Sequence, residues 1–281
     1  MNRFVFCCTS PAVVAALGAA LQTGQAQEGA RRASPPSLPS VEVSALRDPV
    51  EKSYRRIVKG MDVFERQRRL APNARLRFRL IARQPDTDLR GVSVKIVGET
   101  IAIPVEVGAD NTFELGRFPK ALAEDALVVP DRRAGTLTWR TDVRTPGLPP
   151  DTRRLGDLRL ECLVGLESGL ISNTRPSFLG DLVRLVADSG YCAQRVPHYL
   201  FFADRPLWNV VLVHGSRRET VPVEQLYAGS SRETPGPDEL RHCDCEVLLD
   251  RTYYAPLGDP RWPDDTLLVF EYMDERPELV R

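Results

Sequence analysis

Alternating apolar and polar residues give the strongest structural signal in this chain. In residues 75–80, arginines alternate with Leu76, Phe78 and Leu80, which predicts a strand with one face on a core and one face in water. Similar apolar runs, separated by Gly, Pro, Asp and Asn, predict the other strands: residues 92–96, 101–107, 113–115, 127–129, 137–143, 158–164, 199–202, 208–213, 220–223, 246–249 and 266–273. The pattern predicts a mainly β protein with short helices (α+β), in which an antiparallel β-sandwich is followed by a second β-rich portion.

Helical spacing predicts two longer helices. The first begins at Asp48-Pro49, because Asp is a good N-cap and Pro suits the first helical position, and it runs to residue 70. Its apolar positions recur at the helical period: Val50, Tyr54, Ile57, Met61 and Phe64. The second begins at a Ser177 cap and ends at Gly190. One or two further helical turns are expected at residues 119–125.

The first 26 residues have the organisation of a secretory signal peptide. An apolar run at residues 12–21 is followed by Gly24-Gln25-Ala26, which places small residues at the positions that a signal peptidase reads. The alternative is an uncleaved anchor, since residues 4–21 just reach spanning length, but Thr9-Ser10-Pro11 interrupts them. We therefore expect cleavage after residue 26, a periplasmic or secreted location, and no integral membrane segment in the cleaved protein.

Composition divides the rest of the chain into a linker and two domains. Residues 27–47 are rich in Ala, Ser and Pro and hold too few apolar residues for a core, which predicts a flexible linker. A helix plus β-sandwich domain is expected at residues 48–170, and a C-terminal β-rich domain with one helix at residues 171–281. The stiff segment at residues 145–150 is either a connection inside the first domain or a boundary.

Charge narrows the range of partners. The 281 residues contain 38 basic and 38 acidic side chains, and a net charge of zero argues against nucleic acid as a partner. The row Arg75, Arg77 and Arg79 on one strand face could bind an anionic ligand, but a row of this kind is more typical of a solvated strand face.

The cysteines point to disulfides. Removal of the signal peptide would leave an even number of cysteines in an oxidising compartment: Cys162, Cys192, Cys243 and Cys245. Cys243 and Cys245 lie too close along an extended chain to bond to each other with normal geometry. We therefore expect Cys162 and Cys192 to bond separately to these two, in either order. The alternative is one bond plus two buried free thiols.

No metal or cofactor site is expected. His198, His214 and His242 are the only histidines, and the spacing of Cys243 and Cys245 does not match that of a zinc site. His214-Gly215 follows a strand, as in α/β-hydrolases, but the chain lacks the Gly-x-Ser-x-Gly nucleophile motif that such enzymes need. These observations favour a hairpin turn at His214.

The last third of the chain holds the remaining candidates for chemistry. Its carboxylates are candidate acid–base groups: Asp264, Asp265, Glu271, Asp274 and Glu275. Its aromatic residues could line a groove for a sugar or peptide, although core packing is the more common use: Trp208, Tyr253, Tyr254, Trp262 and Tyr272.

The sequence favours a non-enzymatic protein over an enzyme, because every catalytic motif lacks a required part. We expect an exported cell-envelope protein that acts as a binding or interaction module for another envelope protein or a cell-wall ligand. The alternative is a secreted hydrolase that uses carboxylates or His214 near the C-terminal aromatics.

Overall fold

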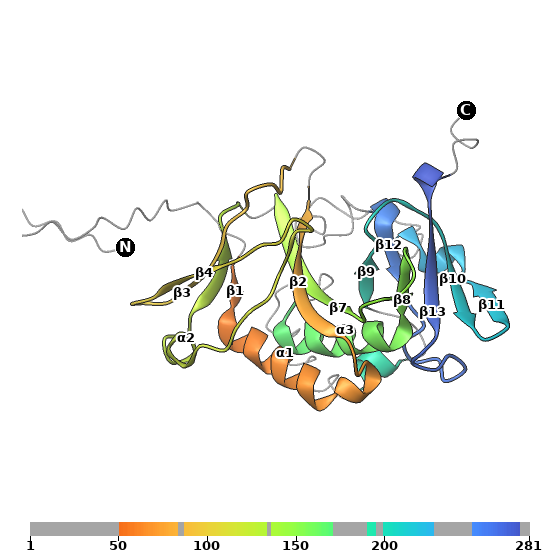
Figure 1. Ribbon diagram of the computed structural model, residues 1–281, viewed down its shortest axis with the longest axis horizontal. Coiled ribbons are helices and arrows are strands. Elements are labelled where there is room, and N and C mark those ends of the chain that lie inside the picture. Colours follow the sequence, from red (N-terminus) through yellow and green to blue (C-terminus); the bar gives the residue numbers. More distant parts are fainter. Residues whose placement is uncertain are drawn as a thin grey trace, which may run out of the picture. The chain divides into compact units, whose positions relative to one another are not determined.

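Three α-helices and thirteen β-strands lie in the part of the chain that the computed structural model describes (Figure 1). This part comprises residues 51–83, 87–133, 136–170, 190–194, 199–227 and 249–275. All of it belongs to the larger of the two units into which the chain divides, residues 45–281. The protein is mainly β with short helices, as the sequence predicts.

The described strands form four antiparallel sheets. The first has the order β1 (Lys52–Ser53), β6 (Leu127–Pro130), β3 (Val94–Val97) and β4 (Ala102–Val105). The second has the order β5 (Thr112–Phe113), β2 (Arg75–Ala82) and β7 (Leu137–Arg144). The third has the order β11 (Arg217–Thr220), β10 (Leu207–His214), β13 (Leu267–Tyr272) and β8 (Thr152–Arg154). The fourth pairs β12 (Thr252–Tyr254) with β9 (Leu200–Phe202).

The helices are short. The α-helices are α1 (Tyr54–Arg66), α2 (Pro119–Ala123) and α3 (Leu155–Ser168). Single 3-10 turns occur at Arg68–Leu70, Tyr191–Ala193, Val223–Gln225, Leu249–Arg251 and Met273–Glu275. Within the described residues, no helix is both long enough and apolar enough to cross a membrane.

Helix α1 begins later than the sequence indicates. Its N-cap is Ser53, whose hydroxyl accepts a hydrogen bond from the Arg56 N–H at 3.4 Å. The predicted cap at Asp48-Pro49 lies outside the described residues. Ser53 takes this role because it ends β1, which pairs with β6, and the helix can start only where that pairing stops.

The prediction of a strand at residues 158–164 is wrong, because these residues belong to helix α3. Both faces of α3 are buried: Leu158 and Cys162 join one hydrophobic cluster, whereas Leu160 joins another. A segment that is apolar on every side has no polar face to reveal its period. Here α3 packs against α1 and β7, and the helix fills the space between them.

Most of the other predicted strands are confirmed, with boundaries shifted by a few residues. Strands β8 and β12 are absent from the prediction, and β11 begins at Arg217 rather than at residue 220. Leu249 belongs to a 3-10 turn, and the rest of the predicted strand at 246–249 lies outside the described residues. The predicted helix at 177–190 also lies outside them, apart from Gly190.

Strand β8 and helix α3 connect the two predicted domains. β8 pairs with β13, the last of the described strands, and Leu155 and Leu158 of α3 share a hydrophobic cluster with C-terminal residues such as Trp262. The boundary at residue 170 and the two-layer sandwich remain predictions.

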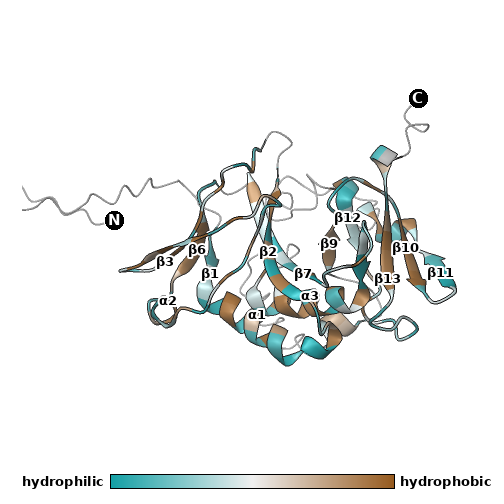
Figure 2. Cartoon of the chain, viewed as in Figure 1, coloured by the Kyte–Doolittle hydropathy of each residue, from teal (hydrophilic) through white to brown (hydrophobic). Residues whose placement is uncertain are grey.

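Two hydrophobic clusters form most of the core. One contains aromatic rings of the second sheet: Phe78 and Phe113 are stacked with centroids 5.6 Å apart, and Phe113 and Trp139 are tilted relative to each other with centroids 5.4 Å apart. The other lies among the C-terminal strands. In Figure 2, β9 and β13 are largely hydrophobic, whereas the exposed strand β11 is hydrophilic. Burial of these side chains supplies the main stabilisation of the fold.

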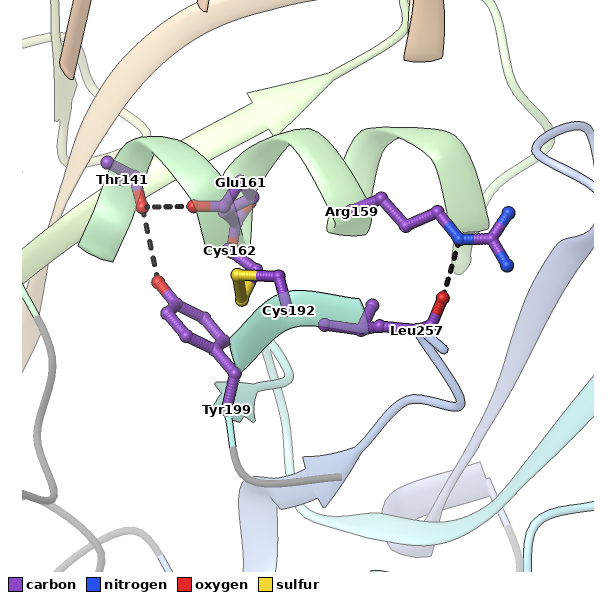
Figure 3. Close-up of a disulfide and its surroundings, with 7 residues drawn as sticks. All are labelled: Thr141, Arg159, Glu161, Cys162, Cys192, Tyr199 and Leu257. Atoms are coloured by element: carbon purple, nitrogen blue, oxygen red, sulfur yellow. Dashed lines mark hydrogen bonds between the residues drawn. A yellow bond between two sulfur atoms is a disulfide. The ribbon is translucent and has the colours of Figure 1, made fainter. Parts of the chain in front are cut away.

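Cys162 of α3 and Cys192 form a disulfide, with an S–S distance of 2.06 Å and a Cα–Cα distance of 6.0 Å (Figure 3). Both cysteines are disulfide-bonded, but the predicted pairing of each with the segment 243–245 is wrong. Because residues 158–164 form a helix, the buried side of that helix carries Cys162 to the 3-10 turn at Tyr191–Ala193. Cys243 and Cys245 lie outside the described residues.

Candidate functional site

The candidate site is a groove that opens where β5 leaves β2. β5 pairs with β2 only through Phe113 opposite Phe78 and Thr112 opposite Arg79. β2 itself is longer at this end and remains paired with β7 on its other side, as far as Arg75. The chain after Phe113 therefore diverges from β2 and leaves a wedge-shaped space between them.

Tyr54, the first residue of α1, holds this space open. Its hydroxyl donates a hydrogen bond to the Gly116 carbonyl at 2.7 Å and accepts one from the Phe118 N–H at 2.8 Å. Tyr54 is fully buried, and Leu115, which precedes Gly116, is also buried. The segment 114–118 is thus fixed to α1 and cannot continue along β2.

The resulting space, which we call the α1–β2 groove, has a volume of about 540 Å³. Apolar side chains lie at its base: Met61, Phe64, Leu76, Phe78 and Leu115. Charged side chains lie around them: Glu65, Arg68, Arg75, Glu114 and Arg117. A concave surface with an apolar base and a few charged groups at its rim is typical of a ligand-binding site.

The edge of β2 that faces the groove has an unpaired backbone position. The Leu80 N–H donates to the Asn111 carbonyl on the β5 side, and alternate residues of a strand direct their backbone groups to the same side. The N–H and C=O of Leu76 therefore point into the groove. Among the described residues, no strand pairs with Leu76 on that side.

Two charges at the rim have no partner within the described part of the chain. Arg117 pairs with Asp62 at 2.7 Å, and Arg68 pairs with Glu65 at 3.1 Å. By contrast, Arg75 and Glu114 are exposed and make no ion pair with any described residue. They lie on opposite walls of the groove, one on β2 and the other on the segment after β5.

A second groove, of about 510 Å³, lies on the other side of the segment after β5 and shares Glu114 with the first. Its far wall is β4, the edge strand of the first sheet. Pro104 stands on that edge and lacks the N–H that an added strand would need. This edge is therefore blocked to strand addition, whereas the edge of β2 at Leu76 is open.

A second set of charged residues, which we call the buried charge cluster, lies between β7, α3 and the β9–β10 turn. Asp142, Arg153 and Glu161 are buried, whereas Arg144 is partly buried and Asp204, at the edge of the cluster, is exposed. Arg144 donates to Asp142 at 2.7 Å and to both oxygens of Asp204 at 2.9 and 3.1 Å. Arg153 donates to Glu161 at 2.7 Å. The cavities beside the cluster measure only about 40 and 20 Å³. The ion pairs within this cluster and the small size of the cavities beside it indicate a structural role.

Proton affinities in this cluster reflect both burial and pairing. Burial alone would raise the pKa of Asp142, but Arg144 and Arg79 outweigh it and hold the pKa well below its usual value. Burial raises the pKa of Glu161, while Arg153 and the Val143 N–H act in the opposite direction.

The predicted row of solvated arginines is correct only for Arg75. Arg77 donates to Asp110 at 2.9 Å and to Asp142 at 3.2 Å, and Arg79 lies 3.6 Å from Asp142. Cross-strand pairing places Asp142 directly opposite Arg77, so the row is neutralised from the neighbouring strand.

The C-terminal candidates are not gathered into a site. His214 Nε2 lies 3.4 Å from Asp265, and both side chains are exposed at the end of a hairpin. Asp264 is held by Arg159 at 2.6 Å. None of these residues lines either large groove. His214 lines neither of these grooves and neither of the small cavities beside the buried charge cluster.

The aromatic residues are used mainly in the core, as expected. Tyr253, Trp262 and Tyr272 are at most 2% exposed, whereas Trp208 is 41% exposed. Glu271 and Asp274 are separate surface positions on and after β13.

The described residues contain no group of three or more His, Cys, Asp or Glu side chains placed to bind a metal ion. His198, His242, Cys243 and Cys245 are not among those residues.

No pattern in the sequence indicates the roles of Tyr54 and Glu114. Tyr54 reads as one apolar position of a helix, and its partner Gly116 lies 62 residues away. Glu114 reads as the polar residue of an alternating strand. The short length of β5 creates the site, and only tertiary pairing reveals where β5 ends.

Comparisons with known proteins give no further assignment: no protein-family model matches the sequence, and the searches of curated proteins and of solved structures return no match.

Proposed function

We propose that this protein is an exported, non-enzymatic binding module of the cell envelope that binds another polypeptide in the α1–β2 groove. The observation that carries this proposal is the open edge of β2 at the base of a large groove. Backbone hydrogen bonds at an open strand edge, together with apolar contacts beside it, are a recurring way to recognise an extended peptide.

The volume and lining of the groove also support a peptide ligand. About 540 Å³ is within the range of small-ligand sites, and partly exposed Met61 and Leu76 offer apolar contact. Methionine adapts its shape to different partners, which suits a binding surface.

A display library of random peptides tests this proposal. The wild-type protein is expected to enrich peptides, and Met61→Trp, which fills the groove, is expected to remove the enrichment. Lys59→Trp is the matched control, because Lys59 lies on the same helix and is exposed outside the groove. Equal enrichment by both variants, or none by the wild type, would contradict the proposed site.

Export is tested separately on protein produced with its complete N-terminus. Mass measurement of the mature protein is expected to show a first residue of Gln27. A mature protein that retains Met1 in the cytosolic fraction would contradict export.

A further inference from the structure

We infer that the α1–β2 groove selects an extended peptide in which a basic residue precedes, and an acidic residue follows, one apolar residue. This inference rests on the proposed function and specifies the ligand of the same site. It depends on the open position of Leu76 and on two charges that have no ion-pair partner among the described residues, Arg75 and Glu114.

The unpaired backbone of Leu76 fixes the position of the apolar residue. The N–H of a peptide residue opposite Leu76 can donate to the Leu76 carbonyl, and its carbonyl can accept from the Leu76 N–H, as in a hydrogen-bonded pair of an antiparallel sheet. Residues directly opposite each other share a face of the sheet, so this side chain joins Leu76 above Met61 and Leu115. An apolar residue is therefore required at this position.

The flanking positions meet the two charges. In an antiparallel peptide, the residue after the apolar one lies beside Arg75, and the residue before it lies beside Arg77. Phe113 is opposite Phe78, so Glu114, the next residue of the chain, lies near the level of Arg77. An acidic residue thus meets Arg75, and a basic residue meets Glu114.

Arg77 does not cancel this preference for a basic residue. Its guanidinium is already paired with Asp110 at 2.9 Å and with Asp142 at 3.2 Å. Glu114 makes no ion pair with the described residues and lines the grooves on both sides of it. The nearest uncompensated charge at this level is therefore negative.

The antiparallel direction follows from the sheet itself. β2 is antiparallel to both of its neighbours, β5 and β7. Antiparallel pairs are slightly more stable for each residue than parallel ones. A peptide paired with Leu76 takes the place beside β2 that β5 leaves after Phe113, and we expect it to run in the same direction as β5.

Three short peptides, capped at both ends and labelled for fluorescence polarisation, provide the test. Their central residues are Lys-Val-Glu, the reversed order Glu-Val-Lys, and the uncharged Gln-Val-Gln. We expect the wild-type protein to bind Lys-Val-Glu roughly tenfold more tightly than Glu-Val-Lys, since two exposed ion pairs together give about this factor. The affinity for Gln-Val-Gln is expected to lie between the affinities for the two charged peptides.

The double variant Arg75→Glu with Glu114→Lys exchanges the two charges and is expected to reverse this order. Both side chains are exposed and make no ion pair with the described part of the chain, so the variant should keep the wild-type unfolding midpoint. An equal affinity of the wild type for the two charged peptides, or an unchanged order in the double variant, would overturn the inference.

A fourth peptide, Lys-Val-Glu with an N-methylated valine, tests the backbone pairing. It removes the N–H that would donate to the Leu76 carbonyl, and we expect at least a fivefold loss of affinity. Unchanged affinity would overturn strand addition at Leu76.

The two proposals fail differently. One outcome is library enrichment that depends on Met61, together with equal affinity for the Lys-Val-Glu and Glu-Val-Lys peptides. This outcome overturns the inference but leaves the proposed polypeptide-binding site intact. Failure of the library and of all the short peptides overturns both.

Discussion

Charged side chains have opposite surroundings in the α1–β2 groove and in the buried charge cluster. In the cluster, Arg153 and Glu161 are 4% and 6% exposed and lie 2.7 Å apart. In the groove, Arg75 and Glu114 face solvent without partners among the described residues. A buried charge must be paired because desolvation is costly, whereas an exposed charge can stay unpaired. The difference separates residues that hold the fold from residues free to meet a ligand.

The largest effect is expected from breaking the buried pair. Arg153→Met leaves the Glu161 carboxylate buried without its partner and should lower the free energy of unfolding by about 3–5 kcal/mol. Urea denaturation measures this loss. The double variant Arg153→Met with Glu161→Leu removes both charges and should recover much of the stability. A loss of less than about 1 kcal/mol in the single variant would place the pair among exposed ion pairs.

The next largest effect is expected from the disulfide. It closes a loop with a sequence separation of 30, and reduction should lower the free energy of unfolding by about 2–4 kcal/mol. Urea denaturation with and without a reducing agent measures the change, and Cys192→Ala should make stability independent of that agent. A digest of the unreduced protein should contain a peptide joining Cys162 to Cys192. A peptide joining either one to Cys243 or Cys245 would contradict this pairing.

Acid should weaken the buried charge cluster. The pKa of Asp142 in the fold lies below its unfolded value of about 3.9, so the ionised carboxylate stabilises the fold above that pH. This stabilisation, on the order of 2–3 kcal/mol, is lost as the pH falls below the unfolded pKa toward the folded one.

Urea midpoints at about pH 6 and at about pH 2 test this pH dependence. Asp142→Asn should flatten the decline, because it removes the titrating carboxylate. An equally steep decline in Asp142→Asn would assign the acid sensitivity to other carboxylates.

Tyr54→Phe links the two regions, because it removes buried hydrogen bonds and also the support of the groove. Loss of the hydroxyl leaves the Gly116 carbonyl and the Phe118 N–H unpaired, which should cost about 1–3 kcal/mol. Peptide affinity should fall as well, because the segment 114–118 is no longer fixed. Fluorescence polarisation measures the affinity, and urea denaturation measures the stability. Unchanged affinity would show that peptide binding does not need the Tyr54 hydrogen bonds to the segment 114–118.

The smallest change in stability is expected in the groove. Arg75→Ala should alter the free energy of unfolding by no more than about 0.5 kcal/mol, since Arg75 is exposed and unpaired. Its affinity for the Lys-Val-Glu peptide should nevertheless fall several-fold. A clear loss of stability with unchanged peptide affinity would show that Arg75 supports the fold and does not bind the peptide.

Much of the β architecture could be predicted from local alternation. Strands β2, β3 and β13 have one buried and one less buried face, so their period is visible in the sequence. Local alternation did not reveal helix α3, because Leu158, Leu160 and Cys162 are all fully buried on different sides of it. It also missed β8, because a three-residue strand carries too little pattern.

The sequence by itself determined the fold class, most of the strands and the presence of paired cysteines. Tertiary structure decided that Cys162 meets Cys192, that Asp142 neutralises Arg77, and that Tyr54 holds the segment after β5 away from β2. These contacts join residues that are 30, 65 and 62 positions apart. Periodicity reports which face of an element is buried, but it carries no information about which distant element covers that face. The candidate site depends on that second kind of information, because it exists only where one strand ends before its neighbour.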